Sequence, residues 1–419
     1  LEAAKREGDL LVVTVTQDEY VNKGPGRPVF NQRLRAESLA ALACVDYVAV
    51  NRWQTAVETI QMLRPDIYAK GVEYSQREQD LSGKIIEEER AILAVGGRLH
   101  FTNEMTFSSS KLLNDHFSVF PPETEAWLRA FRKRYSAERV LDFLERTAAL
   151  KAVVVGEAIL DEYVFCNGLG KSTKEPILAF RYGSTEAHAG GSLAVANHLA
   201  GFCREVELIC CLGERDRREA FIRQQLLPNV RLRAVTRLGA PTIHKRRFVD
   251  IHTGARVFEL YVMDDAPSQP QEEAALLEAL GGAVGEADLV LASDYGHGML
   301  TPPVIDALCE SACFLAVNTQ TNAGNLGFNT ISRYPRADYV CLDGHEIVLE
   351  TRKRHAAWQD LVLDVTKRID CPRFTLTLGS QGSLHYETGA GFTEAPALAT
   401  HVTDRVGAGD AVLAVTSLL

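Results

Sequence analysis

A glycine-rich turn followed by an aspartate lies near the end of the sequence, in the octet Asp404-Arg405-Val406-Gly407-Ala408-Gly409-Asp410-Ala411. Glycines let the chain turn tightly with unobstructed N–H groups, and the apolar helix predicted to follow points its N-terminus at the same place. Such a turn favours an anion, for which a transferred phosphoryl group is the natural candidate. Asp410 could then accept a proton from an attacking hydroxyl. By itself, however, the octet is equally compatible with a plain glycine turn capped by an aspartate.

The elements that must position these residues follow from the order of apolar runs. Strands and helices alternate along almost the whole chain, which predicts parallel α/β sheets. Residues 121–150 open with two prolines and continue as a charged helical pattern, so they are the best candidate for a linker between blocks 1–120 and 151–419. The first block is predicted to hold strands at 10–15, 47–50 and 98–101 and helices around 33–43, 55–63 and 82–95.

Composition narrows the classes of protein. The 419 residues are 46% hydrophobic and 24% charged, which is typical of a globular chain with more than one domain. The formal net charge is −10 and the basic clusters are short, so we predict no nucleic-acid partner. No apolar run approaches the roughly 18 residues of a membrane span, so we predict no membrane partner. Nine cysteines without a C-x-x-C pair indicate reduced thiols in a cytoplasmic protein.

The octet resembles the G-A-G-D signature of the ribokinase (PfkB) family of sugar kinases, and the resemblance covers most of residues 151–419. Gly190-Gly191, ahead of a predicted helix, resembles the family's di-glycine motif, where the backbone approaches the sugar. Asp161 follows the first strand of the block, where the family places an aspartate on the sugar hydroxyls. The resemblance implies that Asp410 is the catalytic base. The anion hole it implies consists of Gly407, Ala408 and Gly409.

The nucleotide side of the site is also implied by the resemblance. The turn with Thr377, Gly379 and Gly382 is similar to the family's T-x-G-x-x-G turn, which lies along the nucleotide. Asp343 and Glu346 stand where the family carries N-x-x-E, which helps to hold the metal shell. ATP is therefore the expected phosphoryl donor, with Mg²⁺ neutralising its charge.

Two segments resemble, in particular, the heptose 7-phosphate kinases of ADP-heptose synthesis. Residues 156–163 are similar to their G-D-x-M-L-D-x-Y segment, and residues 293–298 are similar to their S-D-Y-G-K-G loop, which places Asp294 among the expected substrate-binding residues. The implied reaction is phosphorylation of a sugar phosphate, D-glycero-D-manno-heptose 7-phosphate, at its anomeric hydroxyl. The resemblance leaves a homodimer open.

Some positions depart from the family pattern. Ala194 replaces an Asn, His297 a Lys and Val406 a Thr, while Asp343 replaces the Asn of N-x-x-E. Residues 318–320, Asn-Thr-Gln, replace D-P-K. Two alternatives therefore stay open: a kinase of the same fold for another sugar or nucleoside, and a non-catalytic module that binds a sugar or nucleotide. Because Asp410 and its glycines are kept, we favour retained kinase chemistry.

The first block resembles the nucleotidyltransferase half of the same bifunctional heptose enzymes, a cytidylyltransferase-like domain. Residues 35–46 are similar to one of its helices, and residues 64–71 are similar to its P-D-x-x-x-K-G segment, which makes Lys70 a nucleotide-binding candidate. Ser108, Ser109 and Ser110 resemble its phosphate-binding motif at a helix start. The same residues would also suit an amphipathic helix, a surface lysine and an ordinary helix cap.

The H-x-G-H motif of such transferases occurs nowhere in the 419 residues, and its expected place lies just before Leu1. The sequence begins and ends inside predicted helices, so we expect a chain truncated at both ends. Its complete form would also adenylylate the sugar 1-phosphate. The expected architecture is α/β with two parallel-sheet domains: a Rossmann-like nucleotidyltransferase fragment, followed by a ribokinase-like kinase.

Overall fold

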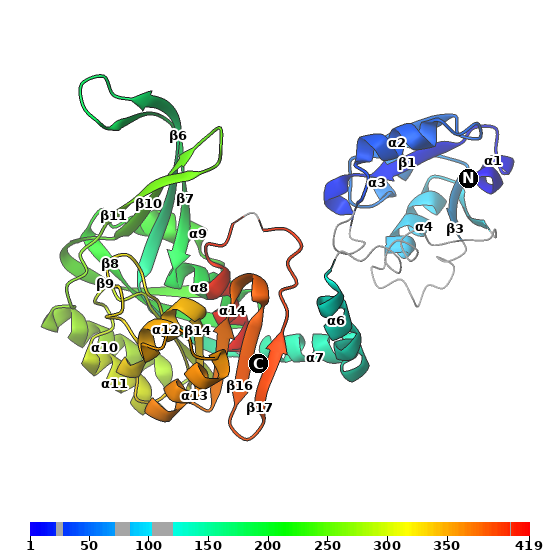
Figure 1. Ribbon diagram of the computed structural model, residues 1–419. Helices are drawn as coiled ribbons and strands as arrows, with labels where there is room; N and C mark the ends of the chain where they lie inside the picture. The colour runs from blue at the N-terminus through cyan, green and yellow to red at the C-terminus, as the bar shows by residue number, and fades with distance from the viewer. Residues whose placement is uncertain (22–27, 72–83, 103–119, 403) are drawn as a thin grey trace. The chain divides into compact units, whose positions relative to one another are not determined.

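The computed structural model describes residues 1–21, 28–71, 84–102, 120–402 and 404–419, which form two compact units, Leu1–Glu125 and Ala126–Leu419 (Figure 1). Both units are α/β with parallel strands, which confirms the predicted fold class. Within the described ranges, no helix combines the length and the apolar character needed to cross a membrane. All nine cysteines are unpaired, in agreement with the expected thiols.

The smaller unit contains two pairs of parallel strands with helices beside them. The strands β1 (Val12–Thr16) and β2 (Tyr47–Asn51) form one pair, and β3 (Ile67–Gly71) and β4 (Arg98–Thr102) form the other. The helices are α1 (Glu2–Arg6), α2 (Gln32–Ala40), α3 (Val57–Leu63) and α4 (Lys84–Ala94). Ile60 on α3 and Ile92 on α4 are fully buried against each other's helix, so an apolar stripe on each helix makes the core of this unit.

Most of the segment predicted to be a linker is helical and packs on the larger unit. It forms α6 (Pro122–Arg134) and α7 (Ala137–Thr147), and α7 begins at Ser136, whose hydroxyl accepts the Arg139 N–H. The Trp127 indole donates to the Glu394 carbonyl at 2.9 Å, and the Thr147 hydroxyl donates to the Phe202 carbonyl at 3.3 Å. These contacts fix both helices to the body of the larger unit.

A nine-stranded sheet in the order β17-β16-β15-β14-β13-β12-β5-β8-β9 forms the centre of the larger unit. The strands from β15 to β9 in that order run parallel, and β16 and β17 add an antiparallel edge. Their bounds are β5 Lys151–Gly156, β8 Glu205–Arg215, β9 Val230–Pro241, β12 Leu289–Asp294, β13 Phe314–Thr319, β14 Tyr339–Asp343, β15 Arg373–Thr377, β16 Ser383–Glu387 and β17 Gly391–Ala395.

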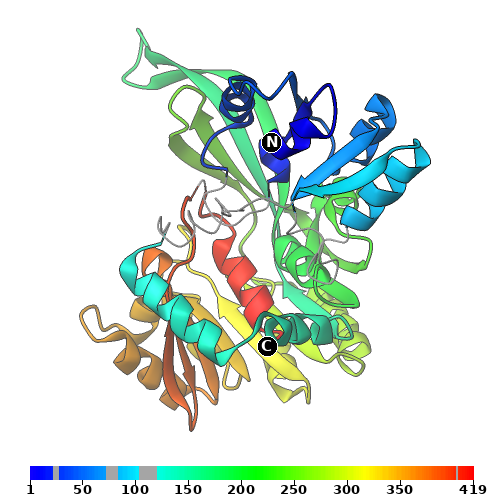
Figure 2. The same ribbon diagram turned by 90° about the vertical axis from the view of Figure 1, so that its right-hand side faces the viewer.

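Helices cover both faces of this sheet because side chains alternate along each strand. On β5, Val153 and Val155 join one buried cluster, whereas Ala152 and Val154 join another. The first cluster holds residues of α10 (Pro270–Val284), α11 (Pro302–Glu310), α12 (Gly344–Thr351) and α13 (Trp358–Arg368). The second holds residues of α8 (Ser192–Ala200), α9 (Glu219–Gln225) and α14 (Ala408–Thr416, red in Figure 2).

A second, four-stranded sheet in the order β11-β10-β6-β7 projects from the body (Figure 1). It consists of β6 (Ala158–Lys171), β7 (Leu178–Gly191), β10 (Ile243–Asp250) and β11 (Arg256–Val262), and we call it the small sheet. Lys245 on β10 lies opposite Asp161 on β6. Since side chains two apart share a face of a strand, Lys245 and Arg247 face the same way as Asp161.

Candidate active site

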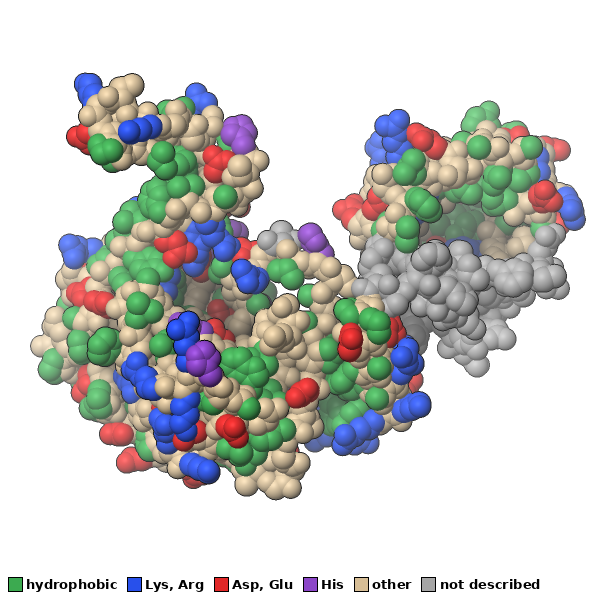
Figure 3. All heavy atoms as spheres, in the orientation of Figure 1, with side chains coloured by type: hydrophobic (Ala, Val, Ile, Leu, Met, Phe, Trp, Pro, Cys, Tyr) green, Lys and Arg blue, Asp and Glu red, His purple; other side chains and the backbone are tan. Residues whose placement is uncertain are grey.

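A cleft of about 290 Å³ lies between the small sheet and the carboxyl ends of the large sheet's strands. Open parallel sheets commonly bind ligands at this edge. Figure 3 shows the hollow on this face of the larger unit, with Lys and Arg side chains beside it. The residues that line the cleft are Ile159, Asp161, Gly191, Lys245, Arg247, Tyr295, Asn318, Gln320, Thr321, Cys341, Leu342, Asp343, Glu346, Thr377, Arg405, Val406, Gly407, Gly409 and Asp410.

Asp410 lies in the first turn of α14 and lines this cleft, although only 9% of its surface is exposed. The Tyr295 hydroxyl donates to its Oδ1 at 2.9 Å, and the Gln320 amide donates to the same oxygen at 2.8 Å. Burial raises the pKa of Asp410 above its ordinary value, and the two hydrogen bonds act in the opposite direction. The carboxylate is therefore held in place and kept basic, as a proton acceptor should be.

The glycine turn brings the start of α14 to the same cleft. Gly407 caps the helix with φ +78°, a left-handed conformation that favours glycine. Gly407 and Gly409 line the cleft, whereas Ala408 is the first residue of α14 and does not. The dipole and the first N–H groups of this helix favour an anion beside Asp410, although the Ala408 N–H also donates to the Arg405 carbonyl at 3.3 Å.

The sugar-binding candidates lie across the cleft on the small sheet. The Arg247 guanidinium forms an ion pair with Asp161 and another with Glu259 at 3.0 Å. Gly191 lines the cleft, and a Cβ on Gly190 would overlap Oδ2 of Asp161, so the pair needs glycine there. The di-glycine motif thus lets the β7 backbone approach Asp161 closely.

Lys245 adds a second cation to this wall of the cleft. Its ammonium lies 5.3 Å from the ring centre of Tyr261 and 5.8 Å from that of Tyr295, and only 7% of the residue is exposed. Burial lowers the pKa of Lys245, although Asp161 nearby raises it. Among the described residues, no carboxylate lies within ion-pair distance of this lysine, so it retains capacity for an anionic ligand.

The three residues expected along the nucleotide do not all line the cleft. Thr377, at the end of β15, lines the cleft, and its hydroxyl donates to the Leu342 carbonyl at 3.4 Å. Gly379 and Gly382 form the turn after β15, where the Leu378 N–H donates to the Gly382 carbonyl at 2.8 Å. These two glycines do not line the cleft. They belong to the turn that follows Thr377 in the chain.

Asp343 and Glu346 form a reciprocal capping box at the start of α12. Asp343 Oδ1 accepts the N–H groups of His345 and Glu346 at 2.7 and 2.8 Å, and Glu346 Oε2 accepts the Asp343 N–H at 2.8 Å. Glu346 Oε1 accepts the Thr321 N–H at 3.2 Å. Burial, assisted by the Asp343 charge, raises the pKa of Glu346 to about 8.

This pair fits a magnesium ion that keeps most of its water. Within the described ranges, no three His, Cys, Asp or Glu side chains form a ready-made metal cage. Mg²⁺, however, is commonly held by one or two carboxylates together with phosphate oxygens and water. Asp343 Oδ2 accepts no hydrogen bond from a described residue. Burial and, after it, the Asp343 charge raise the pKa of Glu346, and a cation would offset the repulsion between the two carboxylates.

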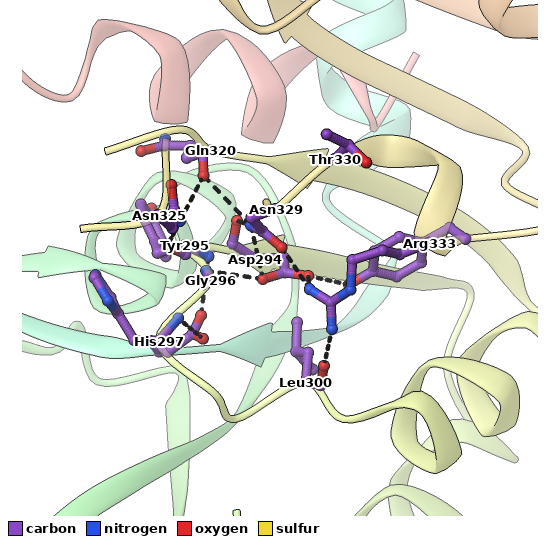
Figure 4. A network of polar contacts seen from close by, with 12 residues as sticks. Asp294, Tyr295, Gly296, His297, Leu300, Gln320, Asn325, Asn329, Thr330 and Arg333 are labelled. Carbon is purple, nitrogen blue, oxygen red and sulfur yellow. Dashed lines mark hydrogen bonds and ion pairs between the residues drawn. The ribbon is translucent and has the colours of Figure 1, made fainter. Parts of the chain in front are cut away.

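Asp294 occupies a different position from the one expected. Only 1% of the residue is exposed, and it does not line the cleft. Its carboxylate accepts hydrogen bonds from Arg333, Tyr334 and Asn329, as well as from the Gly296 N–H (Figure 4). The Asp294 carboxylate therefore organises the loop behind the cleft.

The candidates in the smaller unit are only partly described. The Lys70 ammonium, at the end of β3, lies 2.9 Å from Glu88 Oε2, and the Tyr68 hydroxyl donates to the same oxygen at 3.0 Å. Lys70 is thus already paired with an acidic residue of α4. Ser108, Ser109 and Ser110 lie outside the described residues.

Sequence reasoning did not single out Tyr295, Gln320, Lys245 or Arg247 as site residues. Tyr295 lies inside the S-D-Y-G loop, and Gln320 lies in the segment noted only for departing from D-P-K. Lys245 and Arg247 belong to a short basic cluster, Lys245-Arg246-Arg247, that lies on strand β10. The two-residue spacing of Lys245 and Arg247 was the signal in the sequence that could have identified them, because it puts both cations on one face of a strand.

The projecting small sheet, the doubly covered parallel sheet and the helix-start aspartate between them define a ribokinase-like sugar kinase. The chain belongs to the pfkB family of carbohydrate kinases, whose family model matches residues 149–417. A second family model, described as cytidylyltransferase-like, matches residues 1–115. The chain is thus a carbohydrate kinase with a cytidylyltransferase-like domain.

Curated relatives carry the name bifunctional protein HldE. The protein from Bradyrhizobium diazoefficiens is 28% identical over 285 residues, 66% of this chain and 56% of the relative. The protein from Syntrophotalea carbinolica is 42% identical over 101 residues, 24% of this chain and 19% of the relative. The longer matches cover about two thirds of this chain. They cover only about half the length of the curated relatives.

Solved structures support the fold. The tetrameric inhibited form of phosphofructokinase-2 from Escherichia coli is similar with a TM-score of 0.51 and 16% identity, over 64% of this chain and 86% of that chain. Phosphofructokinase-2 in complex with potassium is similar with a TM-score of 0.50 and 17% identity, over 64% and 85%. Identities this low establish the shared fold alone.

Proposed function

We propose that this chain transfers the γ-phosphoryl group of ATP to the anomeric hydroxyl of a sugar phosphate, D-glycero-D-manno-heptose 7-phosphate. The observation that carries the proposal is the position of Asp410: a buried, doubly hydrogen-bonded carboxylate at the start of α14, lining the cleft at the carboxyl ends of the sheet. The resemblance of two segments to heptose 7-phosphate kinases, and relatives named HldE, support the choice of sugar.

The chemistry follows from the residues in the cleft. Asp161 would hold the sugar hydroxyls, with Gly190 and Gly191 allowing the backbone to approach the ring. Asp410 would take the proton of the attacking hydroxyl as the new O–P bond forms and the bond to the departing ADP breaks. The N–H groups of Gly407, Ala408 and Gly409 would stabilise charge on the transferred group. Mg²⁺ bound near Asp343 and Glu346 supplies charge neutralisation for the ATP phosphates.

Two features support a phosphorylated sugar. Lys245, Arg247 and Arg405 line the cleft, so three cations border the same space as Asp410. Lys245 has no carboxylate partner among the described residues, which leaves its charge for the ligand. The complete protein is proposed to adenylylate the resulting sugar 1-phosphate with its cytidylyltransferase-like domain, in which Lys70, Ser108, Ser109 and Ser110 remain the nucleotide-binding candidates.

The test is the Asp410→Asn variant, with ADP formation measured over a panel of phosphorylated and unphosphorylated sugars and nucleosides. Loss of the base should reduce kcat by about two to four orders of magnitude. Asp360→Asn is the matched control, since Asp360 is an exposed acidic residue in the first turn of α13. A fully active Asp410→Asn would favour a non-catalytic binding module, and preference for another acceptor would favour a different sugar or nucleoside.

A further inference from the structure

The two carboxylate oxygens of Asp410 have different surroundings. Oδ1 accepts hydrogen bonds from both Tyr295 Oη (2.9 Å) and Gln320 Nε2 (2.8 Å). Oδ2 accepts none from the part of the chain that the structure describes. A carboxylate held by two donors on one oxygen cannot rotate freely, so its other oxygen is presented in a fixed direction.

The two donors come from segments that follow neighbouring strands and are tied to each other. Tyr295 follows β12 and Gln320 follows β13. The Asn325 amide donates to the carbonyl of Tyr295 at 2.8 Å and to that of Gln320 at 3.2 Å, as Figure 4 shows. The Asn322 amide donates to the Tyr295 carbonyl as well, at 2.7 Å. One asparagine-rich segment thus fixes the backbone of both donors.

Asn329 extends this arrangement to the buried acid behind the cleft. Its amide donates to the Gln320 carbonyl at 3.3 Å, to the Asp294 carbonyl at 2.9 Å and to Asp294 Oδ1 at 3.1 Å. Arg333 pairs with Asp294 at 3.1 Å and also contacts Asn329 and the Leu300 carbonyl (Figure 4). Every link in this chain is a hydrogen bond between partly or fully buried groups, which makes the support rigid.

We propose that Tyr295 and Gln320 are positioning residues that hold Oδ1 of the base and leave Oδ2 to receive the substrate's proton, and that Asn325 and Asn329 fix these two donors. The inference rests on the proposed function, because it takes Asp410 as the base. It assigns the buried loop after β12 and the asparagine-rich segment 322–329 the same function, which is to hold the catalytic base in position.

The charged groups around Asp410 decide how removal of a donor would be observed. Asp161 from β6 and Glu346 from α12 are negatively charged groups near Asp410. The charge of His198 from α8 lowers the pKa of Asp410. Burial raises the pKa of Asp410 and the Asp161 charge adds to this, whereas the hydrogen bonds from Tyr295 and Gln320 lower it. With a donor removed and these groups unchanged, the carboxylate becomes easier to protonate.

The experiment compares Tyr295→Phe and Gln320→Met with the parent protein. Each variant removes one donor and keeps the size of the side chain. We expect kcat to fall about tenfold, KM for ATP and for the sugar phosphate to stay within about twofold, and the acid limb of the kcat–pH profile to move up by about half to one pH unit. Asn325→Ser, which removes one of the amide donors from each of the two carbonyls, should move the limb in the same direction.

Tyr334→Phe is the matched control. The Tyr334 hydroxyl is equally buried and also donates to a carboxylate, Asp294 Oδ2, at 2.9 Å. It should lower the melting temperature as Tyr295→Phe does, but it should leave the acid limb in place. A purely structural role for Tyr295 and Gln320 would give the same result in all variants.

Two outcomes separate the proposal from the function on which it rests. If Asp410→Asn is inactive while the limb stays in place in both Tyr295→Phe and Gln320→Met, the positioning role is wrong and the kinase assignment stands. If Asp410→Asn is fully active, the base assignment fails and the positioning role fails with it. Should a variant not fold, the remaining donor variant gives the same limb measurement and decides the matter.

Discussion

Arg256 on β11 donates from one guanidinium nitrogen to both carboxylate oxygens of Asp404, at 2.6 Å each. Asp404 also accepts the Val406 N–H at 3.0 Å and the Tyr163 hydroxyl at 3.3 Å. The hydrogen bond from Arg256, followed by the one from the Val406 N–H, lowers the pKa of Asp404 to about 2, so the Arg256–Asp404 pair is ionised at neutral pH. One carboxylate thereby joins the small sheet to the turn that precedes the catalytic candidate Asp410.

This relationship predicts a kinetic effect with little change in stability. In Arg256→Gln the small sheet loses its tie to the glycine turn, and we expect kcat/KM for the sugar phosphate to fall about tenfold. Both side chains are more than one-third exposed, at 43% and 39%, so the free energy of unfolding should change by about 1 kcal/mol or less. Steady-state kinetics and a denaturant titration measure the two quantities.

The matched control is Arg373→Gln. Arg373 pairs with Glu387 at 3.2 Å across β15 and β16, with exposures of 49% and 54%, and neither residue lines the cleft. It should leave kcat/KM unchanged. Equal kinetic losses in both variants would show that the Arg256 pair has no special relation to the cleft.

Gly409→Ala should separate activity from stability. Gly409 lies inside α14 with an ordinary helical φ, and a Cβ there would meet nothing within 4 Å. Alanine should therefore stabilise the helix by up to about 1 kcal/mol. Because Gly409 lines the cleft, the added methyl group would enter the space proposed for the transferred phosphoryl group, and kcat should fall by at least about tenfold.

Gly281→Ala in α10 serves as the comparison, since a Cβ there also meets nothing and the residue lies away from the cleft. It should raise the melting temperature and leave kcat unchanged. Full activity in Gly409→Ala would mean that the start of α14 does not approach the reacting phosphate.

His297 predicts a pH dependence of stability. Burial, with the charges of Lys245 and Arg237, lowers its pKa to about 3, and its Nε2 has no hydrogen-bond partner among the residues that the structure describes. The unfolded chain regains the ordinary pKa near 6.5, so between about pH 6.5 and 3 it binds a proton that the folded chain does not. Stability from this group is therefore present above pH 6.5 and is lost as the pH falls toward 3.

His297→Leu removes that proton uptake and fills the same buried space. Its free energy of unfolding should match or exceed the parent's at pH 8 and should fall less steeply below about pH 6.5. Urea titrations across this range give the slope. His355→Gln, at an exposed histidine, should follow the parent curve, and a His297→Leu curve parallel to the parent would show that His297 is charged when folded.

The sequence predicts the elements of this protein more reliably than the partners of its side chains. Apolar runs place β5 and α14 within a few residues, because both are decided by local hydrophobic patterns. The segment 121–150 was expected as a helical linker, and it forms α6 and α7, but its sequence does not reveal what these helices contact. The indole contact of Trp127 to Glu394 spans 267 residues, and no local pattern reports such a contact.

The residues of the candidate site also differ in how well the sequence predicts them. Asp410 and its glycines are visible in the sequence because one short segment supplies both the turn and the carboxylate. Asp294 was expected to touch substrate, but its neighbours in space, 35 to 40 residues further along, enclose it. Gln320 was noted only as a departure from the family pattern, and its contact with Asp410 lies 90 residues away along the chain.

Lys245→Met tests whether the cleft holds the phosphate that the sugar already carries. Lys245 lines the cleft from the small sheet and has no ion-pair partner among the described residues, so an anionic group of the substrate is its natural ligand. A charge-assisted hydrogen bond of about 2 kcal/mol would raise KM for the sugar phosphate about thirtyfold when removed. The KM for an unphosphorylated sugar should change less than about threefold.

Lys171→Met, at an exposed position at the end of β6, is the control and should change neither KM. Equal losses with both acceptors would place Lys245 in the phosphoryl-transfer step, and no loss with either would place the sugar's phosphate elsewhere.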